Sequence, residues 1–271
     1  MADVKKSDDV KYVRQQYETD SNLAVRIRTH ELYAVPRIDF PAWVLDHIDW
    51  RDDELVLDVG CGAGVYIRAA RRRAGVYIAG DLSLGMLRAL PEQPLPRVNL
   101  DAQQLPIATN AVDVLLANHM LYHVPDQDRA LREFVRVLRP GGVLLAATNS
   151  ETNMSEFATL RQEAATAVGI EPEFPPFPTL TFTLENGGAL LERYFSHVER
   201  HDLPGALLFP DAQPVIDYLA STRELFEKQL PPEKSWDDVA RVLRAMLEPQ
   251  LAREGIYRVN KLTGVFVCRN E

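Results

Sequence analysis

Cysteine is scarce in this chain, and its scarcity limits the kinds of site that the chain can build. Only Cys61 and Cys268 occur among 271 residues, and they are far apart in the sequence. Two cysteines cannot make a four-cysteine zinc module, and neither belongs to a Cys-x-x-Cys pair. Cys61 lies between two glycines, where a small side chain fits a crowded turn. We therefore expect a protein that holds no metal.

Long apolar runs and excess positive charge are also missing. No stretch approaches the ~18–20 apolar residues that a membrane span needs. The start of the chain, Met1 to Val10, is charged and lacks the apolar segment of a signal peptide. A net charge of −9 disfavours a broad surface for nucleic acid, and the run Arg71-Arg72-Arg73 is typical of a solvated helix end. These absences predict a cytoplasmic protein that does not span a membrane.

A glycine-rich turn is the most informative feature that is present. Leu55 to Val59 is an apolar strand pattern interrupted by Asp58, and Gly60-Cys61-Gly62-Ala63-Gly64 follows directly. Glycine can adopt positive φ and has no Cβ, so a ligand can lie against the main chain. The next residues, Val65 to Ala70, have helical spacing. Strand, glycine turn and helix together predict a site for a nucleotide-like ligand.

The spacing of the glycines separates the candidate ligands. A dinucleotide fingerprint places its third glycine five residues after the first, but that position is Val65 here. A phosphate-binding P-loop needs a Gly-Lys-Ser/Thr ending, which is absent. Asp58 would repel a pyrophosphate and attract a cation. The turn therefore favours a cationic ligand over a nicotinamide dinucleotide.

Further elements follow in a regular order. Gly75 to Asp81 is a second short strand that ends in an acid. At this spacing from the glycine turn, a carboxylate can accept from both hydroxyls of a ribose. Alternatively, Asp81 caps a helix that begins near Ser83. Arg97 to Pro106 contains Asp101-Ala102-Gln103. A strand at Ala111 to Ala117 leads to Asn118-His119, and Leu138 to Ala146 combines a helix stop, a Pro-Gly-Gly turn and a fifth strand.

This series of motifs, over roughly residues 50 to 150, resembles the class I S-adenosylmethionine-dependent methyltransferases. The resemblance implies an α/β, Rossmann-like sheet of seven mostly parallel strands with helices on both faces and an antiparallel last strand, here Ile256 to Cys268 after a sixth strand at Val198 to Leu203. It also implies S-adenosylmethionine as cofactor and S-adenosylhomocysteine as product. The residues that match the family's cofactor-binding positions are Asp58, Gly60, Cys61, Gly62, Gly64, Asp81, Leu82, Asp101, Ala102, Gln103, Asn118 and His119.

The segments outside this core predict a helical cap. We expect residues 1–50 to cover the cofactor, 51–150 to form the α/β core, and 151–188 to form a lid or connection with the proline-aromatic loop Glu171 to Pro178. Residues 189–271 are expected to complete the sheet around a helical insertion at 204–255. Within the first segment, Val10 to Tyr17 has a helical pattern. Arg28 is the candidate partner for the cofactor's carboxylate, with Arg26 and His30 as alternatives. The tyrosines of this segment either face the sulfonium or pack in the core: Tyr12, Tyr17 and Tyr33.

The predicted function is methyl transfer by in-line displacement to a small-molecule acceptor, in a monomer or homodimer. His119 either acts as a general base or packs beside the cofactor and hydrogen-bonds it, and His123 is interpreted as structural. Two alternatives stay open: an RNA methyltransferase and a non-catalytic protein that binds S-adenosylmethionine. The first is disfavoured by the negative charge and by the missing zinc module and Asn/Asp-Pro-Pro-Tyr/Phe motif.

Overall fold

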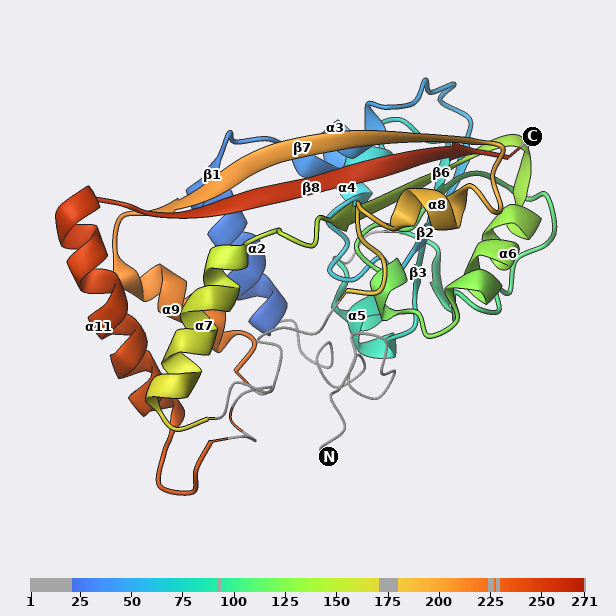
Figure 1. Ribbon diagram of the computed structural model, residues 1–271. Helices are drawn as coiled ribbons and strands as arrows, with labels where there is room; N and C mark the ends of the chain where they lie inside the picture. The colour runs from blue at the N-terminus through green and yellow to red at the C-terminus, as the bar shows by residue number, and fades with distance from the viewer. Residues whose placement is uncertain (1–20, 92–93, 171–179, 224–226, 228–229, 271) are drawn as a thin grey trace.

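The computed structural model of the protein describes residues 21–91, 94–170, 180–223, 227 and 230–270 (Figure 1). Three predicted features, the helix at Val10 to Tyr17, the roles of Tyr12 and Tyr17, and the loop at Glu171 to Pro178, lie outside these residues. Among the described helices, none is long and apolar enough to cross a membrane.

The described strands form one eight-stranded sheet in the order β1-β7-β8-β6-β5-β2-β3-β4. Strands β2 to β6 are all parallel to one another, as the βαβ pattern predicts. The strands are β1 (Ala34–Val35), β2 (Leu55–Val59), β3 (Val76–Asp81), β4 (Arg97–Asn99), β5 (Val112–Leu116), β6 (Leu138–Asn149), β7 (His197–Phe209) and β8 (Tyr257–Arg269).

The antiparallel strands gather at one edge of the sheet. The last strand, β8, lies between β6 and β7 and is antiparallel to both, which confirms the predicted antiparallel last strand. The eighth strand is β1, whose two residues pair with Leu207 and Ala206 of β7. A two-residue strand is too short to show any periodicity, so the sequence predicted seven strands and not eight.

Helices cover both faces of the sheet, because neighbouring strand residues point to opposite sides. In β2, Leu57 and Val59 belong to one buried cluster and Val56 to another. The helical elements are α2 (Ser21–Tyr33), α3 (Phe40–Leu45), α4 (Ile67–Ala70), α5 (Leu84–Ala89), η1 (Leu121–His123), α6 (Gln127–Val137), α7 (Ser155–Ala167), α8 (Gly187–Leu191), α9 (Ala212–Ala220) and α11 (Trp236–Glu254).

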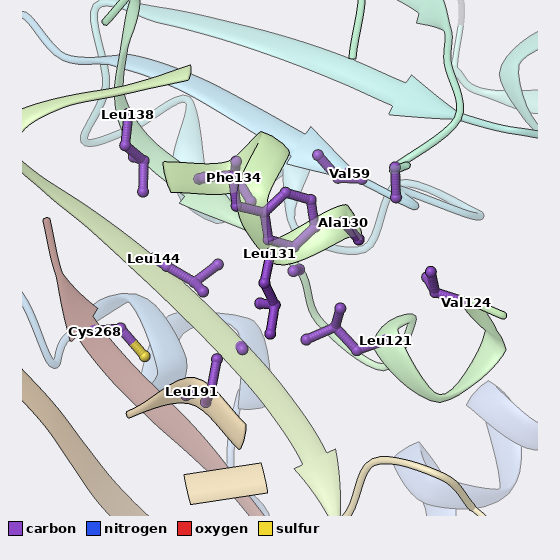
Figure 2. Packing of buried hydrophobic residues seen from close by; sticks show 14 of the residues in the cluster. Val59, Leu121, Val124, Ala130, Leu131, Phe134, Leu138, Leu144, Leu191 and Cys268 are labelled. Carbon is purple, nitrogen blue, oxygen red and sulfur yellow. The ribbon is translucent and has the colours of Figure 1, made fainter. Parts of the chain in front are cut away.

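Helix α6 shows how the first cluster is filled. Its apolar residues recur at helical spacing and are all buried: Ala130, Leu131, Phe134 and Val137. Figure 2 shows Leu131 and Phe134 directed toward the sheet, with Leu144 of β6 and Leu191 of α8 completing the layer. The helix ends at Val137, and β6 already begins at Leu138, before the Pro-Gly-Gly turn that the sequence predicted ahead of this strand.

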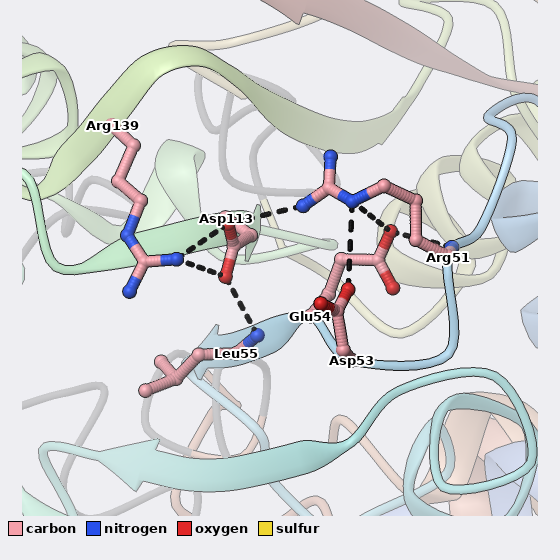
Figure 3. Close-up of polar contacts among 6 residues, drawn as sticks. All are labelled: Arg51, Asp53, Glu54, Leu55, Asp113 and Arg139. Carbon is pink, nitrogen blue, oxygen red and sulfur yellow. Dashed lines mark hydrogen bonds and ion pairs between the residues drawn. The ribbon is translucent and has the colours of Figure 1, made fainter.

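Polar contacts pin the amino-terminal ends of the parallel strands. Asp113 at the start of β5 accepts from the backbone N–H of Leu55 at 2.9 Å and from the Arg139 guanidinium at 2.8 Å. Arg51 lies 3.3 Å from the same carboxylate (Figure 3). This cluster stands at the edge opposite the glycine turn. It therefore fixes the strand ends and leaves the carboxyl edge for a ligand.

The cap consists of α2, α7, α9, α11 and the ends of β7 and β8 that reach beyond the core sheet (Figure 1). These elements share a separate buried cluster that includes Phe157, Phe209 and Leu243. Strand β7 continues through Pro204 to Phe209, so the helices of the predicted 204–255 insertion begin at Ala212. Pro204 is tolerated because β1 pairs only with Ala206 and Leu207, which leaves β7 without a second neighbour at Pro204.

Candidate active site

The glycine turn follows β2 and has the backbone that its sequence predicts. Gly60 and Gly62 have φ of +77° and +50°. The N–H groups of Gly60 and Cys61 both donate to the carbonyl of Gly80, at 2.8 and 2.9 Å, which ties the turn to β3. A Cβ added to Gly62 would meet no atom within 4 Å, and Gly62 lines a cavity. The turn therefore presents bare backbone to a space that a ligand can occupy.

The third glycine has a different task. A Cβ on Gly64, at φ +76°, would lie 2.5 Å from Cδ1 of Ile67 and 2.7 Å from Cδ2 of Leu90. Gly64 does not line the cavity. It allows α4 and the end of α5 to pack closely on the turn, so the structure places this predicted cofactor residue in a packing position.

The cavity lies at the carboxyl edge of the parallel strands, under α2, and has a volume of about 1000 Å³. It brings together eleven of the predicted cofactor residues from four separate strand ends. These are Asp58, Gly60, Cys61, Gly62, Asp81, Leu82, Asp101, Ala102, Gln103, Asn118 and His119. Such convergence of polar groups in one large pocket is typical of a ligand site.

Asp81 is buried at the end of β3 and is held by two backbone amides. Gly62 donates to Oδ2 at 2.9 Å, and Ser83 donates to Oδ1 at 2.8 Å. Burial raises the pKa of this carboxyl above its ordinary value, while the amides oppose the rise. Ser83, and not Asp81, caps α5. Each carboxylate oxygen has a second acceptor position, so Asp81 can still accept from ligand hydroxyls.

Asp101 follows β4, and its carboxylate is oriented by hydrogen bonds from Gln103. Its Oδ1 accepts from the backbone N–H of Gln103 at 2.8 Å and from Nε2 of the same residue at 3.1 Å. These two bonds orient the carboxylate, and both residues line the cavity. Ala102 is buried between them. The segment can therefore present an oriented acceptor to a base-like group.

Asp58 is the most strongly perturbed acid of the site. It is 2% exposed, and the Tyr77 hydroxyl donates to its Oδ2. Burial raises the pKa of Asp58 to about 7; the bond from Tyr77 opposes this shift and nearby Asp81 adds to it. A positive charge in the cavity would favour the ionised form. The position thus suits a cationic ligand, as the sequence predicts.

Two buried polar atoms that face this region have no partner among the described residues. Oδ1 of Asn118 accepts from the N–H of Ala147 at 2.9 Å, which leaves its Nδ2 buried without an acceptor. The Tyr66 hydroxyl is also buried and unpartnered. Both residues line the cavity. Unsatisfied buried polar groups are costly, so these atoms fit a ligand that supplies the missing hydrogen bonds.

Comparison with known proteins agrees with this geometry. Residues 57–146 match a family model described as a methyltransferase domain. A demethylmenaquinone methyltransferase from Corynebacterium urealyticum is 34% identical over 116 residues, covering 43% of this chain and 50% of that protein. The chain therefore resembles methyltransferases over residues 57–146. It spans about half the length of this relative.

Solved structures support the fold over nearly the whole chain. A phosphoethanolamine N-methyltransferase from Haemonchus contortus, solved with S-adenosylmethionine, has a TM-score of 0.58 and 16% identity over 99% of this chain and 61% of its own. The [4+2]-cyclase SpnF also has a TM-score of 0.58 and 16% identity, over 98% of this chain and 97% of its own. The same fold therefore occurs in proteins with different reactions.

His119 directly follows the β5 segment and enters the cavity. It has a φ of 55°, its N–H donates to Ala147 at 2.8 Å, and its ring lies 5.5 Å from that of Phe40. Burial, followed by the charges of Lys261 and His123, lowers the pKa of His119 to about 4. The imidazole is therefore neutral at pH 7, a form that can accept a proton or hydrogen-bond a ligand.

Arg28 is exposed and outside the lining of the cavity. Arg26 and His30, four residues apart on α2, do line it. Residues at i and i+4 share a helix face, whereas i+2 points away from it. The structure therefore brings Arg26, and not Arg28, to the site. Tyr33 packs on Phe209, with ring centroids 4.9 Å apart, inside the cap cluster.

Sequence reasoning missed Lys261. On β8, Tyr257 and Val259 face the cap cluster, and Val265 and Val267 face a core cluster. Alternation places Lys261 on the same face, between these two apolar pairs and at the cavity. Burial lowers the pKa of this lysine. The available signal was one charged residue at an inward position of a strand whose other inward residues are apolar except for Thr263.

Proposed function

We propose that this chain is an S-adenosylmethionine-dependent methyltransferase that acts on a small-molecule acceptor. The observation that carries the proposal is the set of acids around the glycine turn. In this proposal Asp81 accepts from the ribose hydroxyls, Asp101 accepts from the adenine amino group, and Asp58 stabilises positive charge. Nδ2 of Asn118 and the hydroxyl of Tyr66, which have no partner among the described residues, can bind the remaining polar groups of the cofactor. The cofactor, when bound, supplies an activated methyl group on a good leaving group.

The remaining work of the protein is alignment and exclusion of water. Methyl transfer needs the acceptor atom about 3–3.5 Å from the carbon that it attacks, along the line of the breaking bond. The cap closes the cavity with α2, Tyr218 of α9 and the Leu203–Ala206 stretch of β7. Neutral His119 stands beside the cofactor half, where it either orients ligands or takes a proton from the acceptor.

Small-molecule methyl transfer agrees with a cavity of about 1000 Å³ under the cap and with the net charge of −9. The relative from Corynebacterium urealyticum is named for a small acceptor, demethylmenaquinone. An RNA methyltransferase would instead present a basic surface and bind RNA with a steep salt dependence. A non-catalytic binder of S-adenosylmethionine would keep the same acids. These two alternatives are outcomes of the experiment below.

The test combines labelled methyl transfer with cofactor binding. We expect wild-type protein, supplied with methyl-labelled S-adenosylmethionine, to label a compound in a fractionated metabolite extract. Asp81→Asn should weaken S-adenosylhomocysteine binding in calorimetry by about tenfold to hundredfold, because charged hydrogen bonds are lost. Asp52→Asn is the matched control, since Asp52 is exposed at φ 67°, where asparagine is tolerated.

The outcomes separate the candidates. Labelled RNA together with salt-steep RNA binding would favour the RNA enzyme. Cofactor binding that is lost in Asp81→Asn, without label in any fraction, would favour the non-catalytic binder. Unchanged affinity in Asp81→Asn would contradict the assignment of the ribose to Asp81.

A further inference from the structure

The charged groups that line the cavity are separated by sign. The acids Asp58, Asp81 and Asp101 belong to the core side, at the ends of β2 and β3 and after β4. The cap side carries the cationic groups Arg26 of α2 and Lys261 of β8, with the neutral ring of His30 beside them. Two further histidines of the lining, His119 and His123, follow β5 on the core side. The remaining charged lining residues are exposed at the rim or, in one case, already ion-paired there: Glu31, Asp39, Arg68, Arg72 and Arg73. The buried part of the cavity thus has an acidic half and a basic half.

The basic half has no counter-ion among the described residues. Arg26, His30 and Lys261 take part in none of the ion pairs there. Lys261 is partly buried, and a buried charge without a partner is costly. Its charge also lowers the pKa of two neighbours: burial and then Lys261 lower the pKa of His30 to about 3 and that of His119 to about 4. Lys261 and both imidazoles line the same cavity, and the imidazoles stay neutral there.

Unused donors converge on the same half. One guanidinium nitrogen of Arg26 and Nδ1 of His30 are buried without a hydrogen-bond partner. The His30 ring stands edge-on to Tyr218, with centroids 6.1 Å apart, so its orientation is set by packing. The Arg26 nitrogen donates, and Nδ1 of neutral His30 donates in one of its two tautomers. Next to an ammonium without a counter-ion among the described residues, such donors suit an oxyanion, whose oxygens only accept.

We propose that the acceptor is a small organic acid, whose carboxylate or ionised hydroxyl is bound by Lys261 with the His30 ring beside it. This rests on the proposed function, because it assigns the acidic half of the cavity to the cofactor. A cavity of about 1000 Å³ lies at the upper end of single-ligand pockets, so the basic half has room for a second molecule. The apolar residues Met154, Leu203 and Ala206, which line the cavity on the side of the cap, favour an acid with an apolar body.

The competing explanation is that Lys261 binds the carboxylate of the cofactor itself. Arg26, one helical turn from His30 and nearer the start of α2, is the other candidate for that carboxylate. The two assignments differ in one measurable respect. If Lys261 binds the acceptor, removing its charge leaves the affinity for S-adenosylhomocysteine unchanged. If it binds the cofactor, that affinity falls.

The experiment uses acids paired with their neutral amides. Benzoate and benzamide, and indole-3-acetate and its amide, are titrated calorimetrically into full-length protein with and without saturating S-adenosylhomocysteine. The variants are Lys261→Met, which keeps the length without the charge, and Lys261→Arg, which keeps the charge. Lys234→Met is the control, since Lys234 is exposed on the loop before α11. Thermal melts check that every variant folds.

We expect at least one acid to bind wild-type protein more tightly than its amide. This preference should fall by about tenfold to hundredfold in Lys261→Met, the effect of losing a charged hydrogen bond. It should persist in Lys261→Arg and Lys234→Met. Equal binding of acids and amides, absence of any binding, or a preference that survives in Lys261→Met overturns the proposal, and so does weaker S-adenosylhomocysteine binding in that variant. Failure of wild-type protein to bind S-adenosylhomocysteine is a separate result, and it counts against the proposed function.

Discussion

At the scale of single residues, the site depends on side chains whose protonation is set by burial. Asp58 and His119 are shifted in opposite directions, the acid upward to about 7 and the histidine downward to about 4. Burial disfavours the charged form in both cases. Without a ligand, both side chains therefore favour their neutral forms. A cationic ligand would favour ionised Asp58, and an anionic ligand would favour protonated His119.

Asp58 should make stability depend on pH. Its folded pKa is above its unfolded value of 3.8, so the folded state holds the extra proton between these values. Its contribution is fully present below pH 4 and is lost as the pH rises through 7, at about 1.4 kcal/mol per pKa unit. Thermal melts of ligand-free protein should therefore show Asp58→Asn gaining stability over wild type between pH 5 and pH 8. A difference that does not change with pH would contradict this.

His119 should be in the neutral form that a general base needs, without first losing a proton. If it is the base, kcat/KM should show no ionisation from this group between pH 5 and pH 8, because its lowered pKa leaves it neutral there. His119→Ala should then lower kcat and leave S-adenosylhomocysteine affinity within about twofold. An inflection near pH 6.5 that disappears in His119→Gln would show an unperturbed histidine instead. Unaltered turnover in His119→Ala would leave alignment as the only role of the site.

At the scale of elements, the glycine turn divides its work between ligand binding and packing. Gly62 borders the cavity, and Gly64 supports α4 and α5, although both have positive φ. The sequence predicts the turn, the strands around it and the acids that follow each strand, because apolar strands and glycines leave local patterns. It does not distinguish Gly62 from Gly64, since the contacts of Gly64 come from Ile67 and from Leu90, distant in sequence.

Three alanine variants separate these roles. Gly62→Ala and Gly141→Ala should each lower the free energy of unfolding by about 1–2 kcal/mol, the cost of positive φ, because neither Cβ would meet another atom. Gly64→Ala should cost more, since its Cβ also collides with two side chains. Only Gly62→Ala should weaken S-adenosylhomocysteine binding strongly. Denaturant unfolding measures the loss of stability, and calorimetry measures the affinity for S-adenosylhomocysteine. Equal affinity in Gly62→Ala and Gly141→Ala would contradict the claim that the ligand lies against Gly62.

At the scale of the whole molecule, the long pair β7 and β8 joins the cap to the core. The two strands pair over thirteen positions, from His197↔Arg269 to Phe209↔Tyr257. Their core ends lie in the sheet, and their far ends carry α9 and α11 (Figure 1). The sequence predicted a break near Pro204 and Gly205 because these residues usually interrupt strands. Pairing with β8 overrides that local preference and places Lys261 at the cavity.

The same arrangement explains which site residues sequence reasoning could find. The residues of the acidic half follow successive strands of one series of motifs. Because the carboxyl ends of parallel strands lie at the same edge of a sheet, the sequence predicts that these residues lie close together. Residues of the basic half, Arg26, His30 and Lys261, come from both ends of the described chain. Only the packing of α2 against α9 and β7 brings them together, and no local pattern encodes that packing.

The central claim is that the acidic half of the cavity selects a cationic nucleoside cofactor, and calorimetric titration of wild-type protein tests it most directly. S-adenosylmethionine and S-adenosylhomocysteine should each bind once per chain with micromolar affinity or better. As the pH rises through 7 and Asp58 ionises, the affinity for cationic S-adenosylmethionine should increase relative to that for its product, which lacks the sulfonium charge. NAD should produce no measurable binding under the same conditions. Binding of NAD as tight as that of S-adenosylmethionine, or no binding of either sulfur compound, would contradict the account.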